Sequence, residues 1–200
     1  RMEIDAAAFE AWECEPCTIG FELVKLRDLI SLAEAGDLIE MNYDENDGRV
    51  NIQVGEINRT IRPLDRATML EPRVPDVELH SSVKLSTVKF SRALRAAKQV
   101  GDLATISLNA QSFGVNVSGD TDTVNVSYDA GELQDLVCDG PVKSQYSLSL
   151  LYPMAKRMEA IVDTVTLFFN ENHPLRLEFE FADGAGRCIY FLAPRIEGDA

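Results

Sequence analysis

The chain has 200 residues, of which 46% are apolar, so it can form one large or two small domains with hydrophobic cores. Its formal net charge is −14, since 33 acidic residues outnumber 19 Lys and Arg. This balance excludes nucleic-acid binding by the surface as a whole, but not by one surface on which the cations are concentrated. No apolar run approaches the roughly 20 residues that span a bilayer, and no basic-then-apolar signal opens the chain, so we expect no membrane association.

The first third of the chain contains one helical pattern and several strand patterns. Residues 1–5 are typical of the last strand of a longer unit, so we expect further residues of the same protein upstream. Leu26, Leu29 and Ile30 recur at helical spacing and indicate a helix. The expected elements are, in chain order, strands at 1–5 and 17–23, a helix at 24–35, and strands at 36–44, 50–54 and 57–64.

The same order of elements returns twice after residue 80. The expected elements there are a strand at 81–85, a helix at 88–100 and strands at 100–108, 113–119 and 123–128, then a strand at 145–149, a helix at 150–158 and strands at 162–171, 175–181 and 186–194. Each unit is a strand, a helix and three strands, repeating about every 60 residues. This predicts an α+β fold with helices on one face of antiparallel sheets. We place Pro153 in the first turn of its helix, where proline fits best.

A segment rich in proline separates one unit from the next two. Residues 63–79 contain Pro63, Pro72 and Pro75 and no glycine. Proline removes a backbone donor and pushes the preceding residue toward extended geometry, so this segment is expected to be an extended connector on a surface. We therefore predict two domains, residues 1–62 and residues 80–200, and the first unit of the earlier domain lies upstream.

The chain shows no pattern of an active site. Its two histidines, His80 and His173, do not form a ligand-spaced pair, and no G-x-S-x-G, phosphate loop or H-E-x-x-H is present. C-E-P-C at Cys14 and Cys17 matches half of a zinc site, but no second pair with ligand spacing follows it. Reduced thiols are the favoured interpretation, and a redox pair is the alternative. We expect no catalytic residues, no metal and no cofactor.

Several segments carry a more specific signal than the strand patterns. They are F-E-L-V-K-L-R-D-L-I at 21–30, the connector from L-D to V-P at 64–75, V-K-L-S-T-V-K-F-S-R at 83–92, H-P-L-R-L-E-F-E-F at 173–181 and Y-F-L-A-P-R-I-E at 190–197. Together with the duplicated unit, they resemble the archaeal and eukaryotic sliding clamps (PCNA) over essentially the whole chain. The resemblance implies the DNA-clamp fold, a further repeat at the front and a processivity factor for DNA replication.

The resemblance also implies a homotrimeric ring whose helices surround duplex DNA and contact only phosphates, without sequence preference. In the helix at 89–100, Phe90 and Leu94 share one face at about 100° per residue, while Arg92 and Arg95 point the opposite way. For any single helix, an ordinary solvated face is the alternative. The expected DNA-facing residues are Lys25, Arg27, Arg92, Arg95, Lys98, Lys156 and Arg157.

In this family the connector and the C-terminal tail flank an apolar pocket, where a short partner motif, the PIP-box, docks. Met69 and Leu70 are alternatives for one position of that pocket. For the pocket residues in general, the simpler alternative is that they pin the connector to the sheet. Carried over by position, the pocket residues are Met69, Leu70, Val74, Pro75, Leu79, Pro174, Ala193, Pro194 and Ile196.

Two predicted edge strands are expected to close the ring by pairing between subunits, residues 57–63 of one subunit with 123–128 of the next. Arg59 and Arg62 would face one or more of Asp120, Asp122 and Asp129. The expected interface residues are Ile57, Arg59, Ile61, Arg62, Val124, Val126 and Tyr128.

The partners implied by the resemblance are double-stranded DNA and, through PIP-box motifs, DNA polymerase, the clamp loader, flap endonuclease and DNA ligase. Its implied location is the cytoplasm or nucleoid of an archaeon, or the nucleus of a eukaryote. Two other functions are weighed against it. One is a clamp relative in a heteromeric damage-signalling ring. The other is a small-molecule enzyme on a duplicated α+β scaffold, which the missing active-site pattern disfavours.

Overall fold

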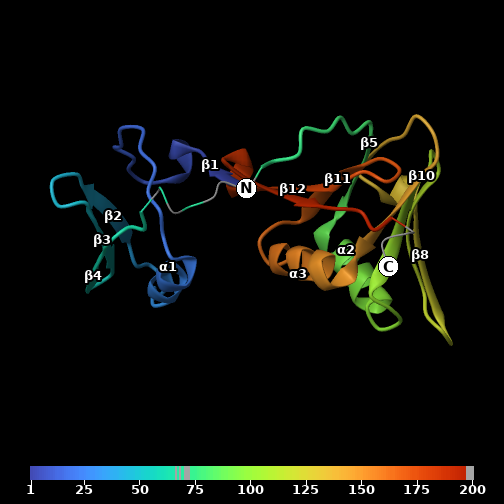
Figure 1. Ribbon diagram of the computed structural model, residues 1–200, viewed down its shortest axis with the longest axis horizontal. Coiled ribbons are helices and arrows are strands. Elements are labelled where there is room, and N and C mark those ends of the chain that lie inside the picture. Colours follow the sequence, from blue (N-terminus) through green and yellow to red (C-terminus); the bar gives the residue numbers. More distant parts are fainter. Residues whose placement is uncertain (66, 68, 70–72, 197–200) are drawn as a thin grey trace. The chain divides into compact units, whose positions relative to one another are not determined.

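The computed structural model describes residues 1–65, 67, 69 and 73–196 (Figure 1). The chain divides into unit 1, formed by Arg1–Trp12 and Val74–Ala200, and unit 2, formed by Glu13–Arg73. The predicted earlier domain, 1–62, included the first twelve residues. Here β1 (Met2–Ile4) instead pairs antiparallel with β13 (Gly186–Leu192), with Met2 opposite Cys188. Periodicity identifies a strand but not its partner, so the sequence did not reveal this grouping.

Unit 1 contains the predicted duplication. The first copy consists of β5 (Ser81–Ser86), α2 (Thr87–Ala97), β6 (Leu103–Leu108), β7 (Ser112–Ser118) and β8 (Thr123–Asp129). The second copy consists of β10 (Val142–Ser147), α3 (Leu148–Met158), β11 (Thr164–Phe169), β12 (Leu175–Phe181) and β13. Short elements lie between or beside them, namely η1 (Ala6–Ala8), η3 (Ala130–Glu132), β9 (Asp135–Val137) and η4 (Ala182–Gly184).

The two copies exchange their first strands. Strand β5 pairs antiparallel with β11 of the other copy, and β10 pairs antiparallel with β6. The resulting sheets have the orders β1-β13-β12-β11-β5-β9 and β10-β6-β7-β8. Equivalent hydrogen bonds mark the start of each helix: Thr87 N donates to Asp163 O at 2.9 Å, and Leu148 N donates to Asp102 O at 2.8 Å. The same junction therefore recurs in both copies.

The core of unit 1 lies between the sheets and the two helices. Side chains along β5 alternate between buried and half-buried, as expected for a strand with one face toward the core. Helix α2 buries Phe90, Ala93 and Leu94, and α3 packs directly beside it (Figure 1). The helices therefore cover one side of the sheets and leave their other faces to solvent.

The start of α3 differs from the prediction. Pro153 lies inside the helix, whose first residue is Leu148, five positions earlier. Proline lacks the N–H that would bond the carbonyl of Ser149, which normally disfavours this position. Burial of Leu151 and Ala155 on either side holds the turn against the core and compensates for the missing bond. Tertiary packing has outweighed the local preference of proline.

Unit 2 contains α1 (Leu23–Ile30) and a three-stranded sheet. The strands are β2 (Ile39–Asp44), β3 (Arg49–Val54) and β4 (Ile57–Ile61), in the order β2-β3-β4. Leu29 of α1 packs with Val50, Ile52 and Val54 of β3 in a small core.

The strand predicted at 17–23 is wrong, because only Gly20 forms a bridge there, with Leu64. In unit 1 the first strand of each copy pairs with a strand of the other copy. The described residues of unit 2 contain only one copy, so residues 17–23 have no second copy there to pair with. The predicted helix at 24–35 also ends early, at Ile30. Local apolar spacing alone therefore overestimated the regular structure of this region.

Adjacent leucines of α3 give a test of this packing. Leu151 is fully buried, whereas Leu150 is 51% exposed. Leu151→Ala should lower the free energy of unfolding of unit 1 by about 2–5 kcal/mol, because it removes buried methyl groups and leaves a cavity. Leu150→Ala should change it by about 0.5 kcal/mol or less. Urea unfolding monitored by circular dichroism measures both, and equal losses would contradict the orientation of α3.

Candidate functional site

The exposed face of α2 is strongly basic. The helix begins after Ser86, whose hydroxyl accepts a hydrogen bond from Lys89 N at 3.4 Å. Because Phe90 and Leu94 occupy the core face, Arg92 and Arg95 point into solvent, as their spacing predicts. Lys98 is also exposed, and its Nζ lies 5.6 Å from the ring centroid of Tyr152 on α3. This cation–π contact joins the exposed faces of the two helices.

A depression of about 130 Å³ lies between α2 and α3. Arg92 and Arg95 enter it from α2, and Lys156 enters it from α3. The remaining lining residues are Val88, Ser91, Tyr152 and Glu159. The structure therefore brings three of the predicted DNA-facing cations together. Arg157 is exposed on α3 but does not line the depression.

One acid, Glu159, lies within this basic surface, and the sequence reasoning missed it. Its carboxylate is paired with Lys156 Nζ. Hydrogen bonds from Lys156 and then from Ser91 lower the pKa of Glu159, and the charges of Lys156 and Arg95 act in the same direction against the effect of burial. Glu159 is therefore ionised at neutral pH and offsets one positive charge. Its spacing of three residues from Lys156 on one helix was the available signal.

The predicted cations of α1 belong to unit 2 and are already paired. Lys25 Nζ lies 2.6 Å from Glu22 Oε1, and Arg27 Nη2 lies 2.6 Å from Asp28 Oδ1. All four side chains are exposed, so these pairs add little stability, but each acid offsets the charge of its partner. Positive charge is therefore weaker on α1 than on α2.

The predicted interface residues lie on sheet edges. Strand β4 is at one edge of the three-stranded sheet, and β8 is at one edge of the four-stranded sheet. Ile57, Arg59, Ile61 and Arg62 belong to or follow β4, with only Ile61 partly buried. On β8, Val124, Val126 and Tyr128 are half-buried, and the residues that alternate with them are exposed. Tyr128 donates from its hydroxyl to Lys89 O at 2.9 Å, which anchors this edge to α2.

The end of the connector and the C-terminal tail leave the same end of the six-stranded sheet. Strand register places Ser81 opposite Phe169 and Leu175 opposite Leu192. Asn170, which follows β11, donates to Glu78 O at 3.1 Å and accepts from His80 N at 3.3 Å. These contacts fix the connector beside the turn that leads into β12.

Most predicted pocket residues are described by the structure. Met69 is exposed in unit 2, and Leu70 lies outside the described residues. In unit 1, Val74, Pro75, Ala193 and Ile196 are exposed, and Leu79, Pro174 and Pro194 are half-buried. The sheet register therefore brings Leu79, Pro174, Ala193 and Pro194 to one end of the six-stranded sheet.

A polar cavity of about 350 Å³ adjoins the tail and was not predicted. The tail is held there by a hydrogen bond of 2.8 Å from Arg195 N to Gln145 O. The lining residues are Thr105, Lys143, Ser144, Gln145, Glu171, Asn172, Arg195 and Ile196. Ile196 thus borders a polar space, and it is the one predicted pocket residue in this lining.

Within the described ranges, no group of three or more His, Cys, Asp or Glu is arranged to hold a metal ion. No helix in the described part of the chain is long and apolar enough to cross a membrane.

Residues 73–195 match the family described as "Proliferating cell nuclear antigen, C-terminal domain". The chain belongs to this family. It is 36% identical over 199 residues to the DNA polymerase sliding clamp of Methanosarcina mazei, covering 99% of this chain and 80% of the relative. It is 33% identical over 201 residues to the clamp of Natronomonas pharaonis, covering 99% of this chain and 81% of that one.

Solved clamps have the same fold. The structure titled "C-terminal region of FEN-1 bound to A. fulgidus PCNA" matches with a TM-score of 0.90 and 25% identity, over 99% of this chain and 80% of the clamp. The clamp of Entamoeba histolytica matches with a TM-score of 0.85 and 20% identity, over 98% of this chain and 79% of that clamp. At this identity the match supports the fold alone. The predicted family and α+β clamp fold are confirmed. The family consists of DNA polymerase sliding clamps, which are processivity factors and not enzymes.

Proposed function

We propose that the chain assembles into a closed ring around duplex DNA and holds replication enzymes on it. The main support for this proposal is the basic surface between α2 and α3. Arg92, Arg95 and Lys156 converge there although the whole chain has a net charge of −14. Arginine and lysine side chains on exposed helix faces bind phosphates without reading bases, which suits a protein that slides. The mostly acidic remainder of the surface would repel DNA and so confine it to the helices.

Ring closure rests on the two edge strands. Edges of β4 and β8 present unpaired backbone groups, which natural proteins normally cover or reserve for a designated partner. Because β4 and β8 are different surfaces, their pairing is head to tail, and such pairing closes into a ring when the rotation suits. We assign three identical subunits to this ring, as the family resemblance implies. Arg59 and Arg62 would face the acidic residues flanking β8.

Partner docking is assigned to the end of the six-stranded sheet at which the connector and the tail both lie. Leu79, Pro174, Ala193 and Pro194 supply apolar surface there, and apolar anchors in a groove are the usual means of capturing a short helical peptide. The A. fulgidus clamp, 25% identical to this chain, was solved with the C-terminal region of FEN-1 bound to it. By extension we assign DNA polymerase, the clamp loader, flap endonuclease and DNA ligase as partners through PIP-box motifs. The protein would act on chromosomal DNA, in the nucleoid of an archaeon.

The basic surface predicts a change in the salt dependence of DNA binding. Arg92→Ala together with Arg95→Ala should reduce the magnitude of the slope of log K against log salt by about 2 for each subunit that contacts the DNA, roughly one per lost phosphate contact. Glu159→Gln should strengthen binding, because it frees Lys156. Fluorescence anisotropy with a labelled duplex measures both.

Arg187→Ala is the matched control for the cation variants, because Arg187 lies on β13 and pairs with Glu178. Its neighbour Cys188 is buried, so Arg187 points to the opposite face of the sheet. A slope that falls equally with Arg187→Ala, or not at all with the α2 variants, would contradict the assigned DNA surface.

The edge strands predict a salt-dependent effect on assembly. Arg59→Glu with Arg62→Glu should prevent ring formation at low salt, because like charges would then face each other across the interface. Adding Asp120→Lys and Asp122→Lys to the same chain should restore the ring. Light scattering coupled to size-exclusion chromatography gives the mass of each species. Unchanged assembly of the arginine variants at both low and high salt would contradict the pairing of β4 with β8.

The docking surface predicts a separation of functions. Ala193→Glu with Pro194→Glu should abolish binding of a PIP-box peptide, because a charge would have to be buried on docking. Ring mass should stay the same, since neither residue lies on β4 or β8. Isothermal titration calorimetry measures the binding, with Ile161→Glu, an exposed apolar residue after α3, as the control. Full affinity in the double variant would disprove the assignment.

A further inference from the structure

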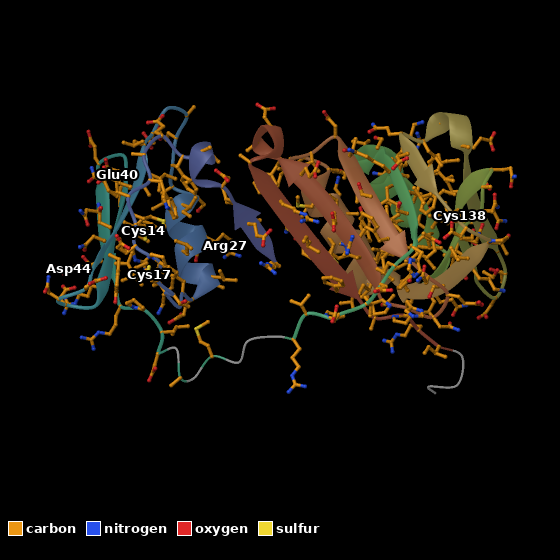
Figure 2. All side chains as sticks on the ribbon, turned by 90° about the horizontal axis from the view of Figure 1, so that it is seen from above. Cys14, Cys17, Arg27, Glu40, Asp44 and Cys138 are labelled. Carbon is orange, nitrogen blue, oxygen red and sulfur yellow. The ribbon has the colours of Figure 1, made fainter. Side chains whose placement is uncertain are left out.

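Two cysteine thiols lie side by side at the start of unit 2. Cys14 Sγ and Cys17 Sγ are 3.8 Å apart and share a hydrogen bond, in which either sulfur can be the donor. Both residues are exposed, and both are labelled in Figure 2. Cys14 Sγ also donates to Glu15 O at 3.0 Å. The C-E-P-C segment therefore already holds its two sulfur atoms close together, with their side chains accessible to reagents in solution.

The distance between the sulfurs is close to that required for a covalent bond. A disulfide has an S–S length of about 2.05 Å, so the two sulfur atoms need to approach by roughly 1.8 Å. Pro16 has a fixed φ and restricts the conformations of the segment between them. The other two cysteines differ, because Cys188 is buried in the core and Cys138 donates to the carbonyls of Leu108 and Gly140.

A metal site is the competing use of two neighbouring thiols. Structural zinc requires four ligands. Within the described part of the chain, no group of three or more His, Cys, Asp or Glu could supply them. The geometry thus leaves a two-sulfur site, which suits a bond between the sulfurs better than a coordinated ion.

We propose that Cys14 and Cys17 are a reversible redox site that forms an intramolecular disulfide by exchange with a low-molecular-weight disulfide. One thiolate attacks the small disulfide, forms a mixed disulfide and releases one small thiol. The second thiolate then attacks the protein sulfur of that mixed disulfide and releases the second small thiol. Two electrons pass from the protein to the small disulfide, and the protons of the two cysteines end on the two released thiols.

The surroundings of the pair set the conditions for this exchange. The pKa of Cys14 is raised, first by its hydrogen bond with Cys17, then by desolvation and by the negative charges near it, which include Glu15 and Glu45. Its thiolate is therefore scarce at neutral pH, and exchange should accelerate as the pH rises.

The position of the pair indicates what the bond would change. The chain passes from unit 1 to unit 2 between Trp12 and Glu13, and α1 begins at Leu23. A disulfide between Cys14 and Cys17 closes a short loop in the segment joining β1 to α1. It therefore reduces the conformational freedom of that segment, in a way that the cell's thiol pool can reverse.

The test uses the whole chain in buffers with increasing ratios of oxidised to reduced glutathione, followed by alkylation and mass spectrometry. We expect the loss of two hydrogen atoms, about 2 Da, and a peptide linking Cys14 to Cys17. The rate of formation should rise between about pH 7 and 9. Cys14→Ser and Cys17→Ser should each stop at a mixed disulfide on the remaining thiol, whereas Cys138→Ser should behave as the unaltered chain.

Two results would overturn the proposal. The first is that both thiols remain open to alkylation, or carry separate mixed disulfides, across the whole range of buffers. The second is stoichiometric binding of zinc alone that protects both thiols, which would make the pair a metal site. The measurement reads only thiol chemistry, so its outcome is independent of whether the chain encircles DNA.

Discussion

The exchange of first strands between the two copies of unit 1 is the constraint on which the rest of that unit depends. Because β5 completes the sheet of β11 and β10 completes the sheet of β6, neither copy closes its own sheet. The paired hydrogen bonds from Thr87 to Asp163 and from Leu148 to Asp102 then fix where each helix starts. With both helices started at equivalent points, α2 and α3 lie against each other and share one exposed surface.

Under the proposed function, that shared surface reconciles the acidic composition of the chain with DNA binding. Net charge describes the average over the whole surface, whereas phosphate binding depends on the local field. Core packing on one side of α2 forces Arg92 and Arg95 to the other side, and α3 contributes Lys156 at the same place. Glu159 within this group offsets part of the positive charge, so the surface is basic but moderated.

The register of the six-stranded sheet brings together two segments that are far apart in the sequence, the connector and the C-terminal tail. The ends of β11 and β13 and the starts of β5 and β12 coincide, so the connector and the tail emerge together although more than a hundred residues separate Leu79 from Ala193. Asn170 and Gln145 then hold the two segments by bonds to their backbone. Through this register, apolar residues of the connector and of the tail lie at the same end of the six-stranded sheet.

The sequence by itself determined the duplicated unit, the α+β class, the basic face of α2 and, through the L-A-P-R-I-E tail, the family. These features depend on local periodicity or on short motifs, which a single sequence contains. Only the tertiary structure decided that β1 pairs with β13, that Pro153 lies inside α3 and that 17–23 forms no strand. It also placed Glu159 against Lys156 and Cys14 against Cys17. Periodicity shows which face of an element is apolar, but the partner of that face is chosen by packing energy between segments distant in the chain.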